Sequence, residues 1–337
     1  MRYSSSECEV CGFRALTHIG RRSYHRSEID KLDAYNAKRF TVLFTRWFPE
    51  RNEVELSSIL CSRCGFIAYE PRPERGDVDA KYRLLEELGQ DYGGNPPNSP
   101  IELRRARALY EQVADQIDIG DVKNVLDYGG GDGRLMQEFV RVGKSCFNID
   151  YNRNSVTGVE KLGDTLDSLE PARQFDLIIC SHVLEHVAEP LAVVKELSQH
   201  LTGNGWIYIE VPMEVWKAPP LHPEPVTHIN FFTPNSLRNL LTLAGLSVSE
   251  SRLGAYLHPL GTWVHVVRAI ARRDRAQVSQ ILPRLRPPEA PQLLQPGLAT
   301  YGRYIWANPR MLLYTFRDRF ALAYKILCRA LRISNRG

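Results

Sequence analysis

The stretch VLDYGGGDGR, residues Val125–Arg134, decides the fold expected for this chain. Four of the five residues from 129 to 133 are glycine, and they follow a short apolar run that ends at Asp127. A glycine in regular structure costs roughly 0.5–1 kcal/mol relative to alanine, so this concentration implies a backbone that turns tightly or is approached closely. We interpret the stretch as a buried strand followed by a ligand-binding loop.

Segments on both sides of this loop alternate between strand-like and helix-like patterns. Residues 175–180, FDLIIC, are apolar apart from Asp176, which is typical of a strand buried on both faces of a parallel sheet. The alternation predicts an α/β fold with a doubly wound sheet. The expected strands are 124–127, 145–149, 175–180, 206–211, 246–250 and 262–269, and the expected helices are 77–89, 100–117, 135–142, 188–201 and 233–245.

The glycine spacing separates three interpretations of the loop. A merely flexible connection is disfavoured because the flanking segments are well formed. A dinucleotide-binding G-x-G-x-x-G loop needs glycine where the chain has Arg134, and a Walker A loop needs a G-K-[ST] sequence that does not follow. The spacing that remains is G-x-G-x-G over residues 129–133, preceded by Asp127. It resembles motif I of the class I S-adenosylmethionine-dependent methyltransferases.

The resemblance to this family extends over about residues 100–273. It includes Phe175–His186, FDLIICSHVLEH, which is similar to the family's fourth strand and the loop beneath the reactive methyl group. It implies a Rossmann-like, mostly parallel seven-stranded sheet that binds S-adenosylmethionine. The cofactor-binding residues that it implies are Asp127, Gly129, Gly131, Gly133, Asp150, Asp164 and Ser181.

The acidic members of this set have different implied roles. Asp127 suits the ammonium group of the methionine moiety, and a loop cap is its alternative role. Asp150 ends the second expected strand, where an acid binds the ribose hydroxyls. Asp164 lies where the family has an acid near the adenine, and exposure to solvent is its alternative.

Four of the seven cysteines form two matching C-x-x-C-G-F patterns, at residues 8–13 and 61–66. Two such pairs indicate a four-cysteine zinc site, in which the glycine lets the chain turn toward the thiolates. Together with Pro-Arg-Pro at 71–73, they resemble the zinc ribbon that precedes the catalytic domain in sugar methyltransferases. We therefore expect structural zinc, held by Cys8, Cys11, Cys61 and Cys64.

Histidine is the expected base, because methyl transfer from a sulfonium depends on positioning and on removing a proton from the nucleophile. His182 follows the strand 175–180. His228 lies in a stretch, VTHINFFTP, similar to one in sugar C-methyltransferases, where the histidine is a base. That family often has tyrosine where Pro225 stands, which disfavours C-methylation. Packing at a helix entry is the alternative role of His228.

Other residues near the expected acceptor site have weaker assignments. No N-P-P-Y or D-P-P-Y motif of amino-group methylases follows the strand 175–180. His186 is expected to pack a helix and His222 to be an exposed loop residue. Residues 213–225, with four prolines, are expected to form a substrate lid.

The 337 residues divide into four expected regions. They are a zinc ribbon at 1–75 with a helical insertion around 27–47, a helical lead-in and linker at 76–122, a methyltransferase domain at 123–273 and a basic, partly amphipathic helical tail at 274–337. The tail carries a net charge of +8 within a total of +4, so the rest of the chain is acidic.

The basic tail is expected to dock on the protein itself or on a second copy. Contact with an anionic membrane surface is an alternative, and nucleic acid is the least favoured partner. The chain has no apolar run of about 18 residues and no signal-like N-terminus. A cytoplasmic location is therefore expected, with the inner face of the membrane as the alternative.

These features together predict an S-adenosylmethionine-dependent methyltransferase. The expected acceptor is an oxygen or carbon of a saccharide-like small molecule such as a nucleotide sugar or glycan. The alternative enzyme is an RNA methyltransferase that grips nucleic acid with the ribbon and the tail. The alternative outside enzymes is a scaffold that binds S-adenosylmethionine without turnover.

Overall fold

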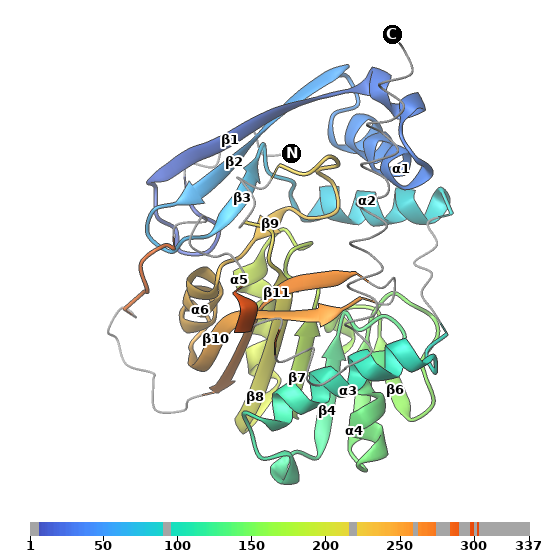
Figure 1. The fold of residues 1–337 in the computed structure, drawn as a ribbon, viewed down its shortest axis with the longest axis vertical. Helices are drawn as coiled ribbons and strands as arrows, with labels where there is room; N and C mark the ends of the chain where they lie inside the picture. The colour runs from blue at the N-terminus through green and yellow to red at the C-terminus, as the bar shows by residue number, and fades with distance from the viewer. Residues whose placement is uncertain are drawn as a thin grey trace.

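The computed structural model describes residues 7–89, 96–215, 221–258, 262–273, 284–289, 297–299 and 302. Within these residues the chain forms a four-stranded antiparallel sheet and a seven-stranded sheet, which lie one above the other in Figure 1. Among the residues so described, no helix has both the length and the apolar character needed to cross a membrane.

The larger sheet consists of β4 (Asn124–Tyr128), β5 (Ser145–Ile149), β6 (Val159–Gly163), β7 (Phe175–Ser181), β8 (Leu201–Pro212), β10 (Leu246–Leu257) and β11 (Trp263–Arg273). Their order across the sheet is β10-β11-β8-β7-β4-β5-β6. All neighbouring pairs are parallel except the two that include β11. The predicted doubly wound, mostly parallel seven-stranded sheet is confirmed.

Two differences from the predicted elements concern the edge of the sheet and the glycine loop. Strand β6 was not predicted, because its sequence VEKLG places charged residues on a half-exposed edge strand. The predicted helix 135–142 is shorter, since residues 134–136 form a 3-10 turn and α4 spans only Gln137–Arg141. The 3-10 turn at the exit from the loop takes the place of the first turn of the predicted helix.

Helices cover both faces of the larger sheet. On one face lie α3 (Pro100–Ala114) and α4, which share a core with the apolar side chains of β4 to β8. On the other face lie α5 (Pro190–Gln199) and α6 (Pro234–Leu243), together with the four-cysteine region. Figure 1 shows α3 and α4 in front of the central strands. In open α/β sheets, ligands bind beyond the carboxyl ends of the parallel strands. A ligand site is therefore expected at that edge of the sheet, between the two helix layers.

The N-terminal part forms the second sheet, in the order β1-β2-β3-β9. Its strands are β1 (Leu16–His25), β2 (Glu53–Cys61), β3 (Ile67–Glu70) and β9 (Asn230–Phe231), and its helices are α1 (Ala34–Val42), extended by a π turn to Trp47, and α2 (Arg75–Glu87). The insertion predicted as helical does contain α1, but long strands flank it. Strand β9 lies between β8 and α6 in the chain, so the half of the chain that forms the larger sheet also supplies one strand of the N-terminal sheet.

Of the tail, the structure describes residues 284–289, 297–299 and 302. Residues 284–289 lie against α6: Arg286 exchanges two hydrogen bonds with the Asn239 side chain, and Glu289 accepts one from the Asn235 amide. The amphipathic helix predicted near the C-terminus lies outside the described residues.

Candidate active site

The glycine loop joins β4 to α4 at the carboxyl end of the sheet. Gly129, Gly131 and Gly133 have φ angles of +70°, +62° and +77°, a region that disfavours side chains. The Gly131 amide donates to the Asp150 carboxylate at 2.9 Å, and the Asn148 side chain donates to the Gly131 carbonyl at 2.7 Å. The end of β5 thereby fixes the loop and places Asp150 beside it.

Asp127, at the end of β4, is fully buried, and neither carboxylate oxygen has a hydrogen-bond partner among the described residues. A Cβ atom on Gly130 would lie 2.0 Å from Oδ2, so the loop closes directly over the carboxyl group. Burial, with the nearby charges of Asp150 and Asp132, raises the pKa of Asp127 to about 8, while Arg105 opposes the shift. A cationic ligand group would satisfy this buried carboxyl.

Arg105, on the buried face of α3, is a second group with unused hydrogen-bonding capacity. Its Nη1 has no partner among the described residues, whereas Nη2 donates to Ser181 Oγ at 3.3 Å and to Glu210. The guanidinium also covers the Tyr256 ring, with Cζ 3.9 Å from the ring centroid. Arg105 was not predicted, because an arginine within an otherwise ordinary helix has no sequence signal of its own.

Ser181, which was predicted to bind the cofactor, belongs to a buried network around Glu210. Glu210 accepts hydrogen bonds from Ser181 at 3.2 Å, from Tyr208 at 3.1 Å and from Arg268 at 3.0 Å. Burial alone would raise the pKa of Glu210, but Arg105 and Arg268 outweigh it and lower the pKa to about 2. One carboxylate thus faces two guanidinium groups, which leaves a net positive charge near the carboxyl ends of β7 and β8.

Asp164 lies just beyond β6, and its side chain is 64% exposed. It forms an ion pair with Lys161 at 2.5 Å. In the structure the Asp164 side chain is exposed to solvent, as the alternative interpretation expected. Its role near an adenine ring stays a prediction.

Six side chains, which we call the histidine cluster, gather beyond the ends of β7 and β8: His182, Glu185, His186, Glu214, His222 and His228. His182 has a φ angle of +59°, which is uncommon for a residue with a side chain. Its Nε2 lies 3.0 Å from the Tyr256 hydroxyl, and its Nδ1 lies 3.3 Å from Glu185 Oε1. The two predicted catalytic residues, His182 and His228, therefore belong to the same cluster.

Glu214 orients His228. The Nδ1 atom of His228 lies 2.9 and 3.0 Å from the two Glu214 oxygens, and since an ionised carboxylate only accepts, Nδ1 is the donor. Burial disfavours the protonated form of His228, but Glu214 outweighs it and raises the pKa of His228 above its usual value. His222 Nε2 lies 3.3 Å from the same carboxylate, so the prediction of an exposed loop residue missed this contact.

Glu185 and His186 form the other side of the cluster. His186 Nδ1 donates to the Thr227 carbonyl at 2.7 Å, and its Nε2 lies 3.5 Å from Glu185 Oε1. Burial lowers the pKa of His186 to about 3. Its ring centroid is 4.9 Å from that of His228. His186 precedes α5 rather than packing within a helix, and the HVLEH run brings both residues to the site.

The N-terminal part of the chain holds the loop that carries His222 and His228. The Tyr24 hydroxyl donates to the His222 carbonyl at 2.7 Å, and the His222 amide donates to the Tyr69 hydroxyl at 3.1 Å. Arg39 donates to Thr227 Oγ1 at 2.8 Å. The position of His222 and His228 therefore depends on the folded N-terminal part of the chain, which no local sequence pattern indicated.

The four predicted cysteine ligands converge. The Sγ atoms of Cys8 and Cys64 lie 3.6 Å apart, as do those of Cys11 and Cys61, and all four lie within 4.8 Å of one another. Sulfur atoms 2.3 Å from a tetrahedral ion are about 3.8 Å apart. Gly12 and Gly65, after each pair, have φ angles of +66° and +76°. The cluster fits a tetrahedral thiolate metal site.

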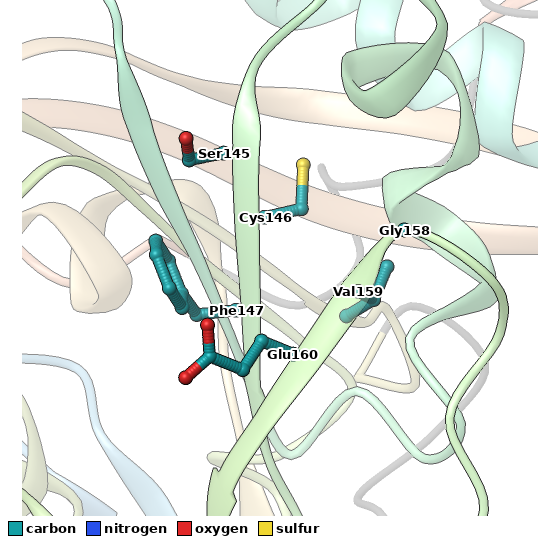
Figure 2. Close-up of a pocket in the computed structure, with 6 residues that line it drawn as sticks. All are labelled: Ser145, Cys146, Phe147, Gly158, Val159 and Glu160. Atoms are coloured by element: carbon teal, nitrogen blue, oxygen red, sulfur yellow. The ribbon is translucent and has the colours of Figure 1, made fainter.

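A separate hollow lies on the sheet between β5 and β6. Figure 2 shows its lining, which consists of Ser145, Cys146, Phe147, Gly158, Val159 and Glu160. These residues are at the amino ends of the two strands, whereas the glycine loop follows the carboxyl end of β4. None of the predicted site residues lines this hollow.

Comparisons with known proteins give a domain match and distant relatives. Residues 101–251 match the family model described as a methyltransferase domain. A ubiquinone biosynthesis O-methyltransferase of Colwellia psychrerythraea is 25% identical over 162 residues, which cover 42% of this chain and 66% of that protein. The protein of the same description from Nitrosomonas europaea is 29% identical over 129 residues, which cover 33% and 54%. The chain thus spans less than two thirds of the length of these relatives.

The comparison with solved structures gives partial matches. The 1,6-didemethyltoxoflavin-N1-methyltransferase of Burkholderia thailandensis, with bound S-adenosylhomocysteine, has a TM-score of 0.43 and 17% identity. The match covers 59% of this chain and 87% of that one.

Proposed function

We propose that this chain transfers a methyl group from S-adenosylmethionine to a small-molecule acceptor, because residues 101–251 match the family model of a methyltransferase domain and the chain forms a mostly parallel seven-stranded sheet. The observation that carries the proposal is the pair of buried, incompletely bonded groups beside the glycine loop, Asp127 and Arg105. The methionine part of the cofactor is a zwitterion, so its ammonium suits Asp127 and its carboxylate suits Arg105. The cofactor supplies a sulfonium methyl group, and the electrons of the broken C–S bond stay on sulfur.

The other cofactor contacts follow from the loop. Gly129, Gly131 and Gly133 keep its backbone bare, and Asp150 offers carboxylate oxygens to the ribose hydroxyls. Ser181 acts through Arg105, to which it is hydrogen bonded. Asp164 remains a candidate for the adenine end.

The histidine cluster is the acceptor side of the proposed site. It follows β7 and β8, next to the strand end that carries Asp127. Oxygen is favoured over carbon as the methylated atom, because the curated relatives are named O-methyltransferases and Pro225 replaces the tyrosine expected for C-methylation. A saccharide-like acceptor remains the proposal for the substrate class.

The cysteine cluster is proposed to hold one zinc ion in a structural role. Four thiolates complete a tetrahedral coordination sphere, so no position is open for a substrate. The ion would stabilise the N-terminal sheet that holds the His228 loop.

Calorimetry with S-adenosylhomocysteine tests cofactor binding. At pH 7 the carboxyl of Asp127, with its pKa of about 8, is mostly protonated, and pairing with an ammonium requires its ionised form. We therefore expect release of about one proton per ligand bound at pH 7, measured as the dependence of the heat on buffer ionisation enthalpy. Asp127→Asn should bind weakly and release none. Binding without proton release in the unmodified protein would contradict this assignment.

Turnover tests the acceptor side. His228→Gln is expected to lower kcat by roughly 10²–10⁴-fold, the range of a lost proton-transfer group, while S-adenosylhomocysteine binds as before. His25→Gln, at the end of β1, is the control and should retain activity. Mass spectrometry of products from a panel of hydroxylated sugars, sugar nucleotides and phenols identifies the acceptor. Unchanged turnover in His228→Gln would remove this residue from the mechanism.

A further inference from the structure

Glu185 is a buried acid whose charge is poorly satisfied. The residue is 1% exposed, and neither carboxylate oxygen has a hydrogen-bond partner among the described residues. Its nearest basic atoms are His182 Nδ1 at 3.3 Å and His186 Nε2 at 3.5 Å. Both distances exceed the 2.7–2.9 Å of a good charge-assisted hydrogen bond. The three neighbouring imidazoles favour the ionised form of this carboxyl group, and a cation held between it and their nitrogens would complete its partners.

The imidazoles around Glu185 are oriented as metal ligands are. His186 uses Nδ1 to donate to the Thr227 carbonyl, so Nε2 carries the lone pair and faces Glu185. His228 uses Nδ1 to donate to Glu214, which leaves its other ring nitrogen available. A carbonyl or carboxylate that fixes one imidazole nitrogen while the other binds a metal is the usual outer-shell arrangement.

We propose that Glu185, His186 and His228 bind a divalent cation of the first transition row, such as Zn²⁺ or Mn²⁺. One ligand atom of each residue lies within 4.8 Å of the other two. Ligand atoms around a bound ion are about 3.0–3.4 Å apart, so small side-chain rotations would bring these three atoms to coordination distance. Two imidazoles and one carboxylate suit such ions, and three protein ligands leave positions open.

The proposal rests on the proposed function and gives it a more specific acceptor. An ion at this position would take the acceptor hydroxyl as a ligand and lower its pKa, so the methylated atom is oxygen. The hydroxyl proton leaves to solvent, the oxygen forms the new O–C bond, and the C–S bond breaks. His228 is then a ligand and not the base expected from its sequence, and the loss of turnover expected for His228→Gln follows from loss of the ion.

A second set of groups, Glu214, His222 and His228, also lies within 4.8 Å. There the carboxylate already accepts from His228 at 2.9 Å and lies 3.3 Å from His222 Nε2. Glu214 is therefore satisfied without an ion, whereas Glu185 is not. This difference favours the Glu185 side.

Manganese binding tests the proposal without any methyl donor. The full chain is first supplied with one equivalent of Zn²⁺, which the thiolates of the cysteine cluster prefer. It is then titrated with Mn²⁺ while the electron paramagnetic resonance signal of free Mn²⁺ is recorded. We expect one Mn²⁺ bound per chain, with coupling to histidine nitrogen in the pulsed spectrum. No binding, or bound Mn²⁺ without nitrogen coupling, would overturn the proposal.

Variants locate the ion. Glu185→Gln and His186→Gln should weaken Mn²⁺ binding by at least 100-fold, and Glu214→Gln, which loosens His228, by 10–100-fold. His25→Gln should bind as the unmodified chain does, and His222→Gln should weaken binding less than Glu185→Gln does. Loss in His222→Gln with retention in Glu185→Gln would place the ion on the other side and refute the proposal. Because the nitrogen coupling is read on the unmodified protein, a variant that fails to fold does not decide the test.

The two proposals fail separately. Mn²⁺ binding without S-adenosylhomocysteine binding would leave the metal site and refute the proposed function. Binding of S-adenosylhomocysteine without Mn²⁺ binding would refute the metal site and leave the proposed function.

Discussion

A Gly130→Ala variant is expected to lose at least 100-fold in affinity for S-adenosylhomocysteine, a loss of about 2.7 kcal/mol. A Cβ atom at this position would lie 2.0 Å from Asp127 Oδ2 and 2.1 Å from its Cγ. The carboxyl group is fully buried, so it has to turn away from its present place or push the loop outward. Either movement separates the carboxyl from the ammonium that we propose it binds. Isothermal calorimetry measures the loss directly.

Gly76→Ala is the matched control for this substitution. Gly76 lies in α2, and a Cβ there would meet no atom within 4 Å. Alanine is the better helix former, so this variant should bind the ligand normally and be as stable or slightly more stable. Normal binding by Gly130→Ala would show that ligand binding does not depend on the position of the Asp127 carboxyl group beneath the loop.

A Cys64→Ser variant is expected to lose its zinc and to unfold its N-terminal sheet at a much lower temperature. Structural zinc in small domains contributes about 10–16 kcal/mol of apparent binding free energy, so losing even a quarter of this costs about 3 kcal/mol. A loss of that size lowers Tm by roughly 6–12 °C in a domain of 150–250 residues. The cysteine is fully buried within a core shared with the larger sheet, so turnover should fall as well.

Cys146→Ser separates loss of the metal from loss of a buried thiol. Cys146 is 3% exposed in β5 and lies outside the cysteine cluster. Its variant should keep one zinc per chain by elemental analysis and lose only about 1–3 kcal/mol of stability, for a buried hydroxyl. Equal zinc content in the Cys64→Ser and Cys146→Ser proteins would exclude the cysteine cluster as the metal site.

Strong local signals in the sequence explain what could be predicted. The apolar runs that become β4, β5 and β7 are buried on both faces of the sheet, and their short length separates them from helices. The two C-x-x-C-G-F patterns bring each cysteine pair together over four residues. Strand β6 was missed because an edge strand tolerates charged residues, and the N-terminal strands were missed because the insertion between the cysteine pairs has no simple period.

Residues of the candidate site could be predicted only where they lie close together in one segment with a recognisable pattern. The glycine spacing with Asp127 and Asp150 is such a segment, and so is the HVLEH run with His182. Arg105 and Glu214 were missed because each is an ordinary charged residue in its own segment. Arg105 becomes significant through its contacts with Ser181 and Glu210, which are 76 and 105 residues away in the chain.

The sequence by itself determined the mostly parallel sheet, the glycine loop and the two cysteine pairs, because each is carried by short segments with a strong local pattern. The tertiary structure alone decided that Arg105 lies near Asp127, that Glu214 fixes His228 and that Glu185 is buried without a full set of partners. These facts depend on which strand ends meet and on how the N-terminal sheet holds the 221–229 loop. Charge and burial at such a meeting point are properties of the packed chain, and no local pattern encodes them.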